Sequence, residues 1–265
     1  MNELYQKILD ENIKLHRIEA RYYEKLHPEG FNWFEQGRVK RDLMYIRDKM
    51  AGPGFALDVG CGTGNIFLKV LAMGFGVWGV DISKEMLDVL EERIPPCSRD
   101  KARLFCRNID DFIADCPRRF DLITISSVLH HLPEYISTLK RALGLLNEGG
   151  YLYITHEPTK SAFAPDRFLR KILWQVDNLG YIVLNINRIP EVEKRDWSMS
   201  DYQLYHGFDE EKVVAACETA GLETTKLVRY SSAMRLGISS WIDSRLLGSK
   251  CQFSMIARRR VSRVP

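Results

Sequence analysis

A glycine-rich stretch early in the chain has the residue types and spacing of a ligand-binding loop. The stretch ALDVGCGTGN, residues 56–65, runs from apolar residues through Asp58 to glycines at 60, 62 and 64. Glycine lets a ligand approach the main chain closely, and backbone N–H groups at a helix start face such a ligand. The pattern therefore predicts a strand, then a loop that cradles a cofactor, then a helix.

The spacing of these glycines bears on which cofactor is bound. A dinucleotide-binding loop has G-x-G-x-x-G, but Asn65 stands where its last glycine would be. This disfavours a pyrophosphate without excluding it. Asp81 ends the next apolar run, GVWGVD. A carboxylate there can accept from two vicinal ribose hydroxyls, as NAD-binding folds also do, so Asp81 does not discriminate between cofactors.

Three histidines follow later apolar runs and are candidates for a catalytic base. His130 and His131 come after DLITISS, and His156 comes after YLYIT, next to Glu157. Histidine titrates near neutrality and suits removal of a proton from a hydroxyl. The alternative is structural: a histidine at these positions can pack against the sheet or cap a loop.

The elements that would position these residues alternate between strand and helix patterns. From Gly54 to Leu152, short apolar runs separate helical patterns such as KEMLDVLEERI and ISTLKRALGLL. This alternation is typical of a parallel sheet with crossover helices. Because the carboxyl ends of parallel strands share one edge, the loops that carry Asp58, Asp81 and the histidines should meet.

The motifs resemble those of class I S-adenosylmethionine-dependent methyltransferases, in the small-molecule, type 11/12-like branch. DVGCGTG resembles motif I of that family, and FDLITISSVLHHLPE and GLLNEGGYLYITHEP resemble its fourth and fifth strands with their loops. The resemblance covers roughly residues 50 to 157. It implies a Rossmann-like, doubly wound, mostly parallel seven-stranded α/β sheet with an N-terminal helical cap and an inserted helical lid.

The resemblance also implies S-adenosylmethionine as the cofactor and assigns residues to it. Asn108 stands where the family often has an acid near the adenine, and its side-chain oxygen can still accept from the adenine amino group. The residues implied in cofactor binding are Asp58, Gly60, Cys61, Gly62, Thr63, Gly64, Asp81, Ile82, Asn108, Ile109 and Ser126.

Segments outside the core are predicted to cover the substrate. We divide the chain into a helical cap (1–50), the cofactor-binding core (51–157), a lid (158–207) and a C-terminal completion of the sheet (208–265). Within these parts, four residues are candidates for substrate contact: Tyr22, His156, Trp174 and His206. The aromatic residues of the lid can equally form the core of that sub-domain.

The composition of the chain limits which cellular location, metals and partners we expect. The chain has 265 residues, 45% hydrophobic and 28% charged, with a net charge of +3. No run of about 18 apolar residues and no leader pattern occurs, so we expect a cytoplasmic protein without a transmembrane segment. The six cysteines lack metal-ligand spacing, and we expect no metal. We expect no nucleic-acid partner.

Together these observations predict a methyltransferase that acts on a small organic acceptor, most simply on the hydroxyl of a secondary metabolite, lipid or sugar. The alternatives are methylation of RNA or protein, or a non-catalytic partner subunit with the same fold. An NAD-dependent oxidoreductase fits the glycine spacing least.

Overall fold

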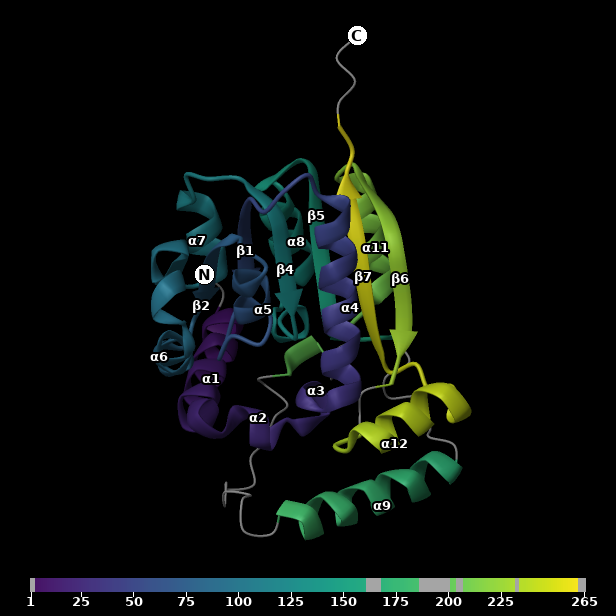
Figure 1. Ribbon diagram of the computed structural model, residues 1–265. Helices are drawn as coiled ribbons and strands as arrows, with labels where there is room; N and C mark the ends of the chain where they lie inside the picture. Colours follow the sequence, from purple (N-terminus) through teal and green to yellow (C-terminus); the bar gives the residue numbers. More distant parts are fainter. Residues whose placement is uncertain (1–2, 161–167, 186–200, 204–206, 232–233, 262–265) are drawn as a thin grey trace.

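The computed structural model describes residues 3–160, 168–185, 201–203, 207–231 and 234–261. At its centre lies one sheet of seven strands in the order β3-β2-β1-β4-β5-β7-β6 (Figure 1). The strands are β1 (Phe55–Val59), β2 (Gly76–Asp81), β3 (Ala102–Cys106), β4 (Phe120–Ser126), β5 (Leu146–Pro158), β6 (Leu222–Tyr230) and β7 (Gln252–Arg259).

The first five strands are parallel, and β7 alone runs antiparallel to its neighbours β5 and β6. The predicted Rossmann-like, mostly parallel sheet of seven strands is therefore confirmed. The C-terminal patterns do complete it, although β7 inserts between β5 and β6.

Helices cover both faces of the sheet. Apolar side chains of α4 (Trp33–Lys49), α5 (Phe67–Ala72) and α6 (Lys84–Arg93) pack on one face. Those of α7 (Ile109–Asp115), α8 (Tyr135–Leu143) and α11 (Glu210–Thr219) pack on the other. Short 3-10 turns precede β3 (η2, Pro96–Lys101) and follow β4 (η3, Leu129–His131). The two cores leave the carboxyl ends of the strands free to carry a site.

The N-terminal helices lie across that edge (Figure 1). They are α1 (Glu3–Glu19), the 3-10 turn η1 (Ala20–Tyr22), α2 (Tyr23–Leu26) and α3 (Pro28–Phe31). Asn32 then caps α4, because its side-chain oxygen accepts from the backbone N–H groups of Phe34 and Glu35. This cap fixes the start of α4 at Trp33.

Two further helices lie beyond the N-terminal helices, away from the sheet. These are α9 (Phe168–Asn185) and α12 (Gly237–Ile242), and α12 continues into the π-helical turn η4 (Asp243–Leu247) (Figure 1). The sequence pattern indicates α9 but not α12 or η4. Within the described part of the chain, no helix is both long and apolar enough to cross a membrane.

One turn differs from expectation. Asn147 to Gly150 has the composition of a turn before the fifth strand, yet β5 already begins at Leu146. The register between β4 and β5 shifts across this stretch, and Gly149 adopts a φ of 74°. The glycines therefore form an irregularity within the strand rather than a turn ahead of it.

Candidate functional site

A cavity of about 210 Å³ opens where the carboxyl ends of the strands face the N-terminal helices. Its floor is built by residues at or just after the ends of β1, β2, β4 and β5, together with the loop into α7. Its roof is built by residues of α1, α2 and α3, with His27 between the last two. Ten of the eleven residues predicted to bind the cofactor line it: Asp58, Gly60, Cys61, Gly62, Thr63, Asp81, Ile82, Asn108, Ile109 and Ser126.

The glycine loop follows β1 and forms part of the floor. Gly60, Gly62 and Gly64 have φ values of 62°, 48° and 95°, which side chains rarely adopt. A Cβ on Gly60 or Gly64 would collide with Val128 or Leu90, whereas one on Gly62 would meet nothing within 4 Å. Packing therefore requires the first and third glycines. Gly62 leaves its main chain open to the cavity, while Gly64, the eleventh predicted residue, lies outside the lining.

Asp81 ties this loop to the end of β2. Its carboxylate accepts from the backbone N–H of Gly62 at 2.8 Å and from that of Ser83 at 2.9 Å. Burial raises the pKa of Asp81, although these backbone donors act against the rise. Each carboxylate oxygen keeps a second lone pair, so the group can still accept from ligand hydroxyls.

Asp58 lies deeper, at the end of β1. One of its oxygens accepts from the hydroxyl of Thr124 at 2.6 Å. Burial raises the pKa of Asp58 to about 7, against the opposing effect of that hydrogen bond. A cationic group in the cavity would be stabilised by this carboxylate and would favour its ionised form. Ribose hydroxyls at Asp81 and a cationic methionine portion beside Asp58 fit this set of groups.

Asn108 occupies the other end of the floor but already has a local task. Its side-chain oxygen caps α7 by accepting from the backbone N–H of Asp110 at 2.8 Å, and its amide N–H donates to Tyr5. The oxygen assigned to the adenine from the sequence therefore has a partner within the chain. Its contact with adenine stays a prediction.

His156 is fixed from all sides at the end of β5. It has a φ of 55°, and its backbone N–H donates to the hydroxyl of Tyr230. Its Nδ1 lies 3.2 Å from the hydroxyl of Ser126, and its Nε2 lies 3.2 Å from Arg38 and 3.4 Å from Glu35. Burial lowers the pKa of His156, although Glu35 acts against this shift. The ring lines the cavity as a neutral group with both nitrogens engaged.

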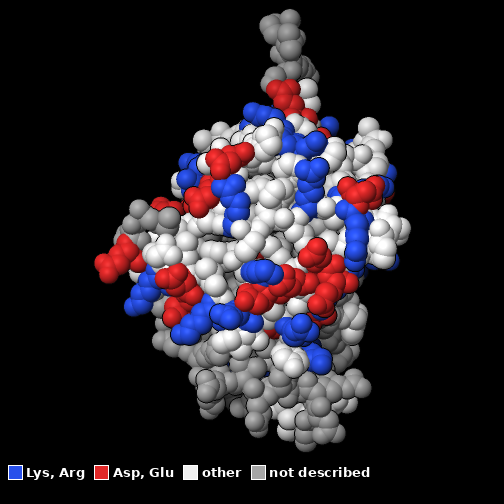
Figure 2. All heavy atoms as spheres, turned by 90° about the vertical axis from the view of Figure 1, so that its left-hand side faces the viewer, with Lys and Arg blue, Asp and Glu red and all other residues white. Residues whose placement is uncertain are grey.

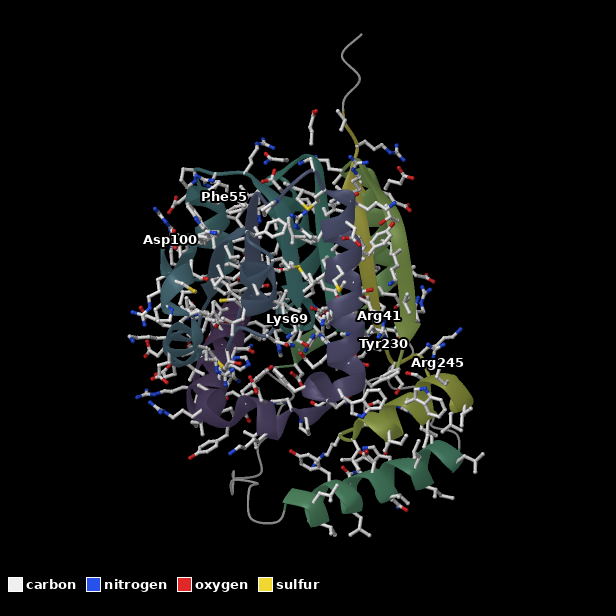
Figure 3. The ribbon with its side chains drawn as sticks, in the orientation of Figure 1. Arg41, Phe55, Lys69, Asp100, Tyr230 and Arg245 are labelled. Carbon is white, nitrogen blue, oxygen red and sulfur yellow. The ribbon has the colours of Figure 1, made fainter. Side chains whose placement is uncertain are left out.

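A buried charged network supports that ring. Arg38 donates to Glu35, Asp42 and the hydroxyl of Tyr230, and its guanidinium lies 3.8 Å from the centre of the Tyr230 ring. Figure 3 shows Tyr230 at the end of β6, beside α4. The network joins α4, β5 and β6 just behind the floor of the cavity.

His130 turns away from the cavity. Its Nδ1 lies 2.8 Å from Glu157, whose carboxylate also accepts from the backbone N–H groups of Val128, Leu129 and His130. Burial opposes protonation of His130, but Glu157 outweighs it and raises the pKa of the ring. This pair fixes the turn η3. His130 therefore has a structural role in the loop, and it does not line the cavity.

His131, the next residue, does line the cavity. Its Nδ1 lies 3.4 Å from a carboxylate oxygen of Asp201, and its ring meets that of His16 edge-on at 5.9 Å. His130, His131 and Asp201 have potential metal-ligand atoms within 4.8 Å of one another. Glu157 already engages one ring nitrogen of His130. The same groups can therefore be described as two histidine–carboxylate pairs, His130 with Glu157 and His131 with Asp201.

The roof brings two histidines that sequence reasoning missed. His16 and His27 line the cavity together with Tyr23, and the rings of Tyr23 and His27 lie 4.5 Å apart. Burial and the neighbouring His131 lower the pKa of His16 to about 3. Burial opposes protonation of His27, but Glu19 and Glu29 outweigh it and raise its pKa to about 9. A neutral and a charged histidine therefore face one space.

Two predicted substrate contacts fall elsewhere. Tyr22 is 45% exposed and outside the cavity lining, whereas its neighbour Tyr23 lines the cavity. Trp174 on α9 is 52% exposed and also outside the lining. His206 lies outside the described residues. Of the predicted substrate contacts, His156 alone is among the residues placed at the cavity.

Surface charge on the face drawn in Figure 2 is mixed. Lys and Arg side chains lie among Asp and Glu side chains there, without a stripe of one sign. A continuous basic stripe is the usual footprint of a nucleic-acid site. This face therefore offers no support for an RNA substrate.

The comparisons with known proteins concern the core of the chain. Residues 57–152 match the family model described as a methyltransferase domain. A ubiquinone biosynthesis O-methyltransferase of Xanthomonas campestris is 30% identical over 129 residues, which are 46% of this chain and 52% of that protein. The chain thus aligns with about half the length of this curated relative.

Solved structures share the fold at low identity. Magnesium protoporphyrin IX methyltransferase from Synechocystis, crystallised with bound SAH, has a TM-score of 0.51 and 15% identity, over 84% of this chain and 82% of that one. An S-adenosylmethionine-dependent methyltransferase from Mesorhizobium loti has a TM-score of 0.54 and 17% identity, over 82% and 97%.

Proposed function

From the match of residues 57–152 to a methyltransferase domain, we propose that the chain uses S-adenosylmethionine to methylate a hydroxyl oxygen of a small organic acceptor. The observation that carries the proposal is one continuous cavity. Its floor holds the glycine loop with Asp58 and Asp81, and its roof holds aromatic and histidine side chains. An acceptor under the roof would lie directly next to the cofactor on the floor.

The protein's contribution is mainly positioning. S-adenosylmethionine supplies a methyl group already activated by its sulfonium, so a nucleophile held in line at short distance can suffice. Asp81 would hold the ribose hydroxyls, and Asp58 the cationic methionine portion. The open main chain at Gly62 leaves room for a ligand at this point of the floor.

We propose His131 as the base that removes the proton from the acceptor hydroxyl. That proton would pass to a ring nitrogen of His131 as the acceptor oxygen takes up the methyl group that the cofactor would supply. Asp201 would orient the ring and stabilise its charged form. His156 is a poorer base because both of its nitrogens have partners, and His130 is turned away.

Small size and an aromatic portion are the acceptor features that the roof favours. Tyr23, Phe31 and His16 present rings to the cavity. The name of the curated relative, a ubiquinone biosynthesis O-methyltransferase, supports oxygen as the atom methylated. A cytoplasmic location remains the prediction drawn from the sequence.

The test is methyl transfer to a panel of phenols, sugars and lipid alcohols. With S-adenosylmethionine labelled in its methyl group, at least one acceptor should gain one methyl on oxygen, detected by mass spectrometry. His131→Ala should lower kcat about 100-fold with cofactor affinity unchanged. His130→Gln is not a suitable control because it weakens η3, so Leu4→Ala, on the exposed side of α1, serves instead.

Two outcomes would contradict the proposal. Cofactor binding without methyl transfer to any acceptor would favour a non-catalytic partner subunit. Full turnover in His131→Ala would leave positioning alone as the source of catalysis.

A further inference from the structure

A chain of polar contacts leads from Arg38, behind the floor, to the cavity. The guanidinium of Arg38 lies 3.2 Å from Nε2 of His156, and Nδ1 of His156 lies 3.2 Å from the hydroxyl of Ser126. Arg38 and His156 are buried, Ser126 is partly exposed, and the last two line the cavity. The chain therefore joins a buried cation to the space where a ligand would bind.

The guanidinium fixes which nitrogen of His156 carries a proton. A guanidinium only donates hydrogen bonds, so Nε2 of His156 must accept from Arg38 and carries no proton. Glu35 lies 3.4 Å from the same nitrogen, but its carboxylate already accepts from two N–H groups of Arg38, at 2.9 and 2.8 Å. Since burial lowers the pKa of His156, the ring is neutral and its one proton lies on Nδ1.

This tautomer fixes the direction of the Ser126 hydroxyl. Nδ1 of His156 donates to the Ser126 oxygen, and a hydroxyl that accepts in this way still has its own proton to donate. Within the part of the chain that the structure describes, the side chain of Ser126 makes no other hydrogen bond. Ser126 therefore offers an O–H donor to an acceptor in the cavity.

The backbone that carries this pair has an unusual conformation. His156 and Ser127 both have a φ of 55°, which residues other than glycine rarely adopt. The hydroxyl of Ser127 donates to the carbonyl of His156, and the backbone N–H of His156 donates to Tyr230. Such strain persists only where surrounding contacts hold it, and it is frequent in ligand sites. It supports a role for His156 in binding, beyond packing against the sheet.

Ser126 lies next to the position proposed for the methionine portion of the cofactor. Thr124 pairs with Asp58 in the sheet and donates to its carboxylate, and Ser126 follows two residues later on β4. Because alternate residues of a strand share one face, Ser126 lies on the same face as Thr124. A methionine portion has a carboxylate beside its ammonium. Next to Asp58 and Asp81, that carboxylate needs a donor to offset the repulsion between like charges.

We propose that Arg38 holds His156 in its Nδ1–H tautomer, so that the Ser126 hydroxyl donates to the carboxylate of the methionine portion. Arg38 and His156 are positioning residues in this arrangement, and Ser126 is the group that touches the cofactor. The inference rests on the proposed function because it needs S-adenosylmethionine on this floor. It adds the direction of each hydrogen bond and a reason for a buried arginine behind the floor.

The binding test compares S-adenosylmethionine with its decarboxylated form, which lacks only the carboxylate. In isothermal titration, Ser126→Ala should bind S-adenosylmethionine about tenfold more weakly than the wild type, because one hydrogen bond to a charged acceptor is lost. Its affinity for the decarboxylated form should stay within about twofold of the wild-type value. Ser137→Ala, on the exposed side of α8, is the matched control and should leave both affinities unchanged.

The tautomer is measured separately, by long-range proton–nitrogen NMR spectra of protein with isotopically labelled histidine. The His156 signals, identified by their loss in His156→Asn, should show a proton on Nδ1 and none on Nε2. Arg38→Lys keeps a cation that only donates and should keep this pattern. Arg38→Met leaves Glu35 without its cation, so Nε2 should gain a proton. Thermal unfolding shows which variants are folded, and the wild type and Arg38→Lys decide the point if Arg38→Met is not.

Other results would overturn the inference. A proton on Nε2 of His156 in the wild type reverses the chain, and an unprotonated Nε2 in folded Arg38→Met removes Arg38 as its cause. Equal losses for both cofactor forms in Ser126→Ala mean that the hydroxyl does not meet the carboxylate. A raised KM for the acceptor with unchanged cofactor affinity places the hydroxyl at the acceptor instead. In each case methyl transfer by the wild type would leave the proposed function standing, whereas a wild type that binds neither form contradicts both.

Discussion

The floor and the roof of the cavity are built in different ways. On the floor, strand ends and buried hydrogen bonds fix each group, as in the contacts of Asp81 with Gly62 and of Glu157 with three backbone N–H groups. On the roof, α1 and the turns that follow it hold Tyr23, His27 and His16 mainly through ring contacts and carboxylate pairs. The floor is therefore rigid by construction, and the roof depends on how the helices pack.

This difference suggests a division of work. A rigid, hydrogen-bonded floor suits one invariable ligand, the cofactor. A roof of helices held by side-chain contacts suits an acceptor, whose shape sets specificity. Substitutions on the floor should then cost stability or cofactor affinity, and those on the roof should alter acceptor binding or pH response.

The largest effect is expected from Arg38→Met. The substitution leaves Glu35 and part of the Asp42 carboxylate buried without their cation, so the free energy of unfolding should fall by about 4 kcal/mol. Urea unfolding measures the change. Arg41→Met, on the exposed side of the same helix, should cost less than about 0.5 kcal/mol. Similar losses for both would show that the network does not stiffen the floor.

Much of the floor could be predicted from the sequence because its signals are local. Three glycines on alternate positions, an acid at the end of the next apolar run and alternating strand and helix patterns are all contiguous motifs. Ten of the eleven predicted cofactor residues line the cavity for that reason. The Arg38 network could not be predicted, since it joins α4 to Thr155 and Tyr230, far apart in the chain.

Asp81→Asn should have the next largest effect. The loss of a charged acceptor for two ribose hydroxyls should weaken S-adenosylmethionine binding about 100-fold, measured by isothermal titration. The retained side-chain oxygen can still accept from one backbone N–H, so the fold should persist. Asp88→Asn, on the exposed side of α6, is the control with unchanged affinity. Equal affinity in Asp81→Asn would remove this residue from the cofactor site.

His27 gives the roof a pH response. Its pKa is raised from 6.5 to about 9, so the folded protein holds a proton that the unfolded chain releases. The stabilisation is complete below pH 6.5 and is lost as the pH rises through 9. The free energy of unfolding should therefore fall by about 3 kcal/mol across this window in the wild type and stay level in His27→Gln.

His16→Gln is the matched control for that measurement. Its pKa of about 3 keeps the ring neutral throughout the window, so the variant should keep the wild-type slope. Parallel curves for the wild type and His27→Gln would show that Glu19 and Glu29 do not hold a charged histidine.

The sequence predicted a helical cap over the substrate, but it did not single out His16 and His27, because these residues interrupt an apolar pattern instead of forming a motif. Asn12, His16, Glu19 and Tyr23 follow one another at intervals of three or four residues, so they share one face of the N-terminal helices. Asn12 and Glu19 are buried. A row of polar residues on the inward face of an amphipathic segment was the available signal. Which strand ends it would meet depends on tertiary packing.

The smallest expected effect is a change in KM for the acceptor when one of two adjacent tyrosines is replaced. This comparison tests the roof most directly. Tyr23 lines the cavity and contacts the rings of His27 and Phe31, whereas Tyr22 is exposed. Tyr23→Ala should raise KM for the acceptor about tenfold, or about 1.4 kcal/mol, with cofactor affinity unchanged. Tyr22→Ala should stay within about twofold in both. If Tyr23→Ala weakened the cofactor instead, the roof would be part of the cofactor site, and the acceptor would have to enter between the roof and His131.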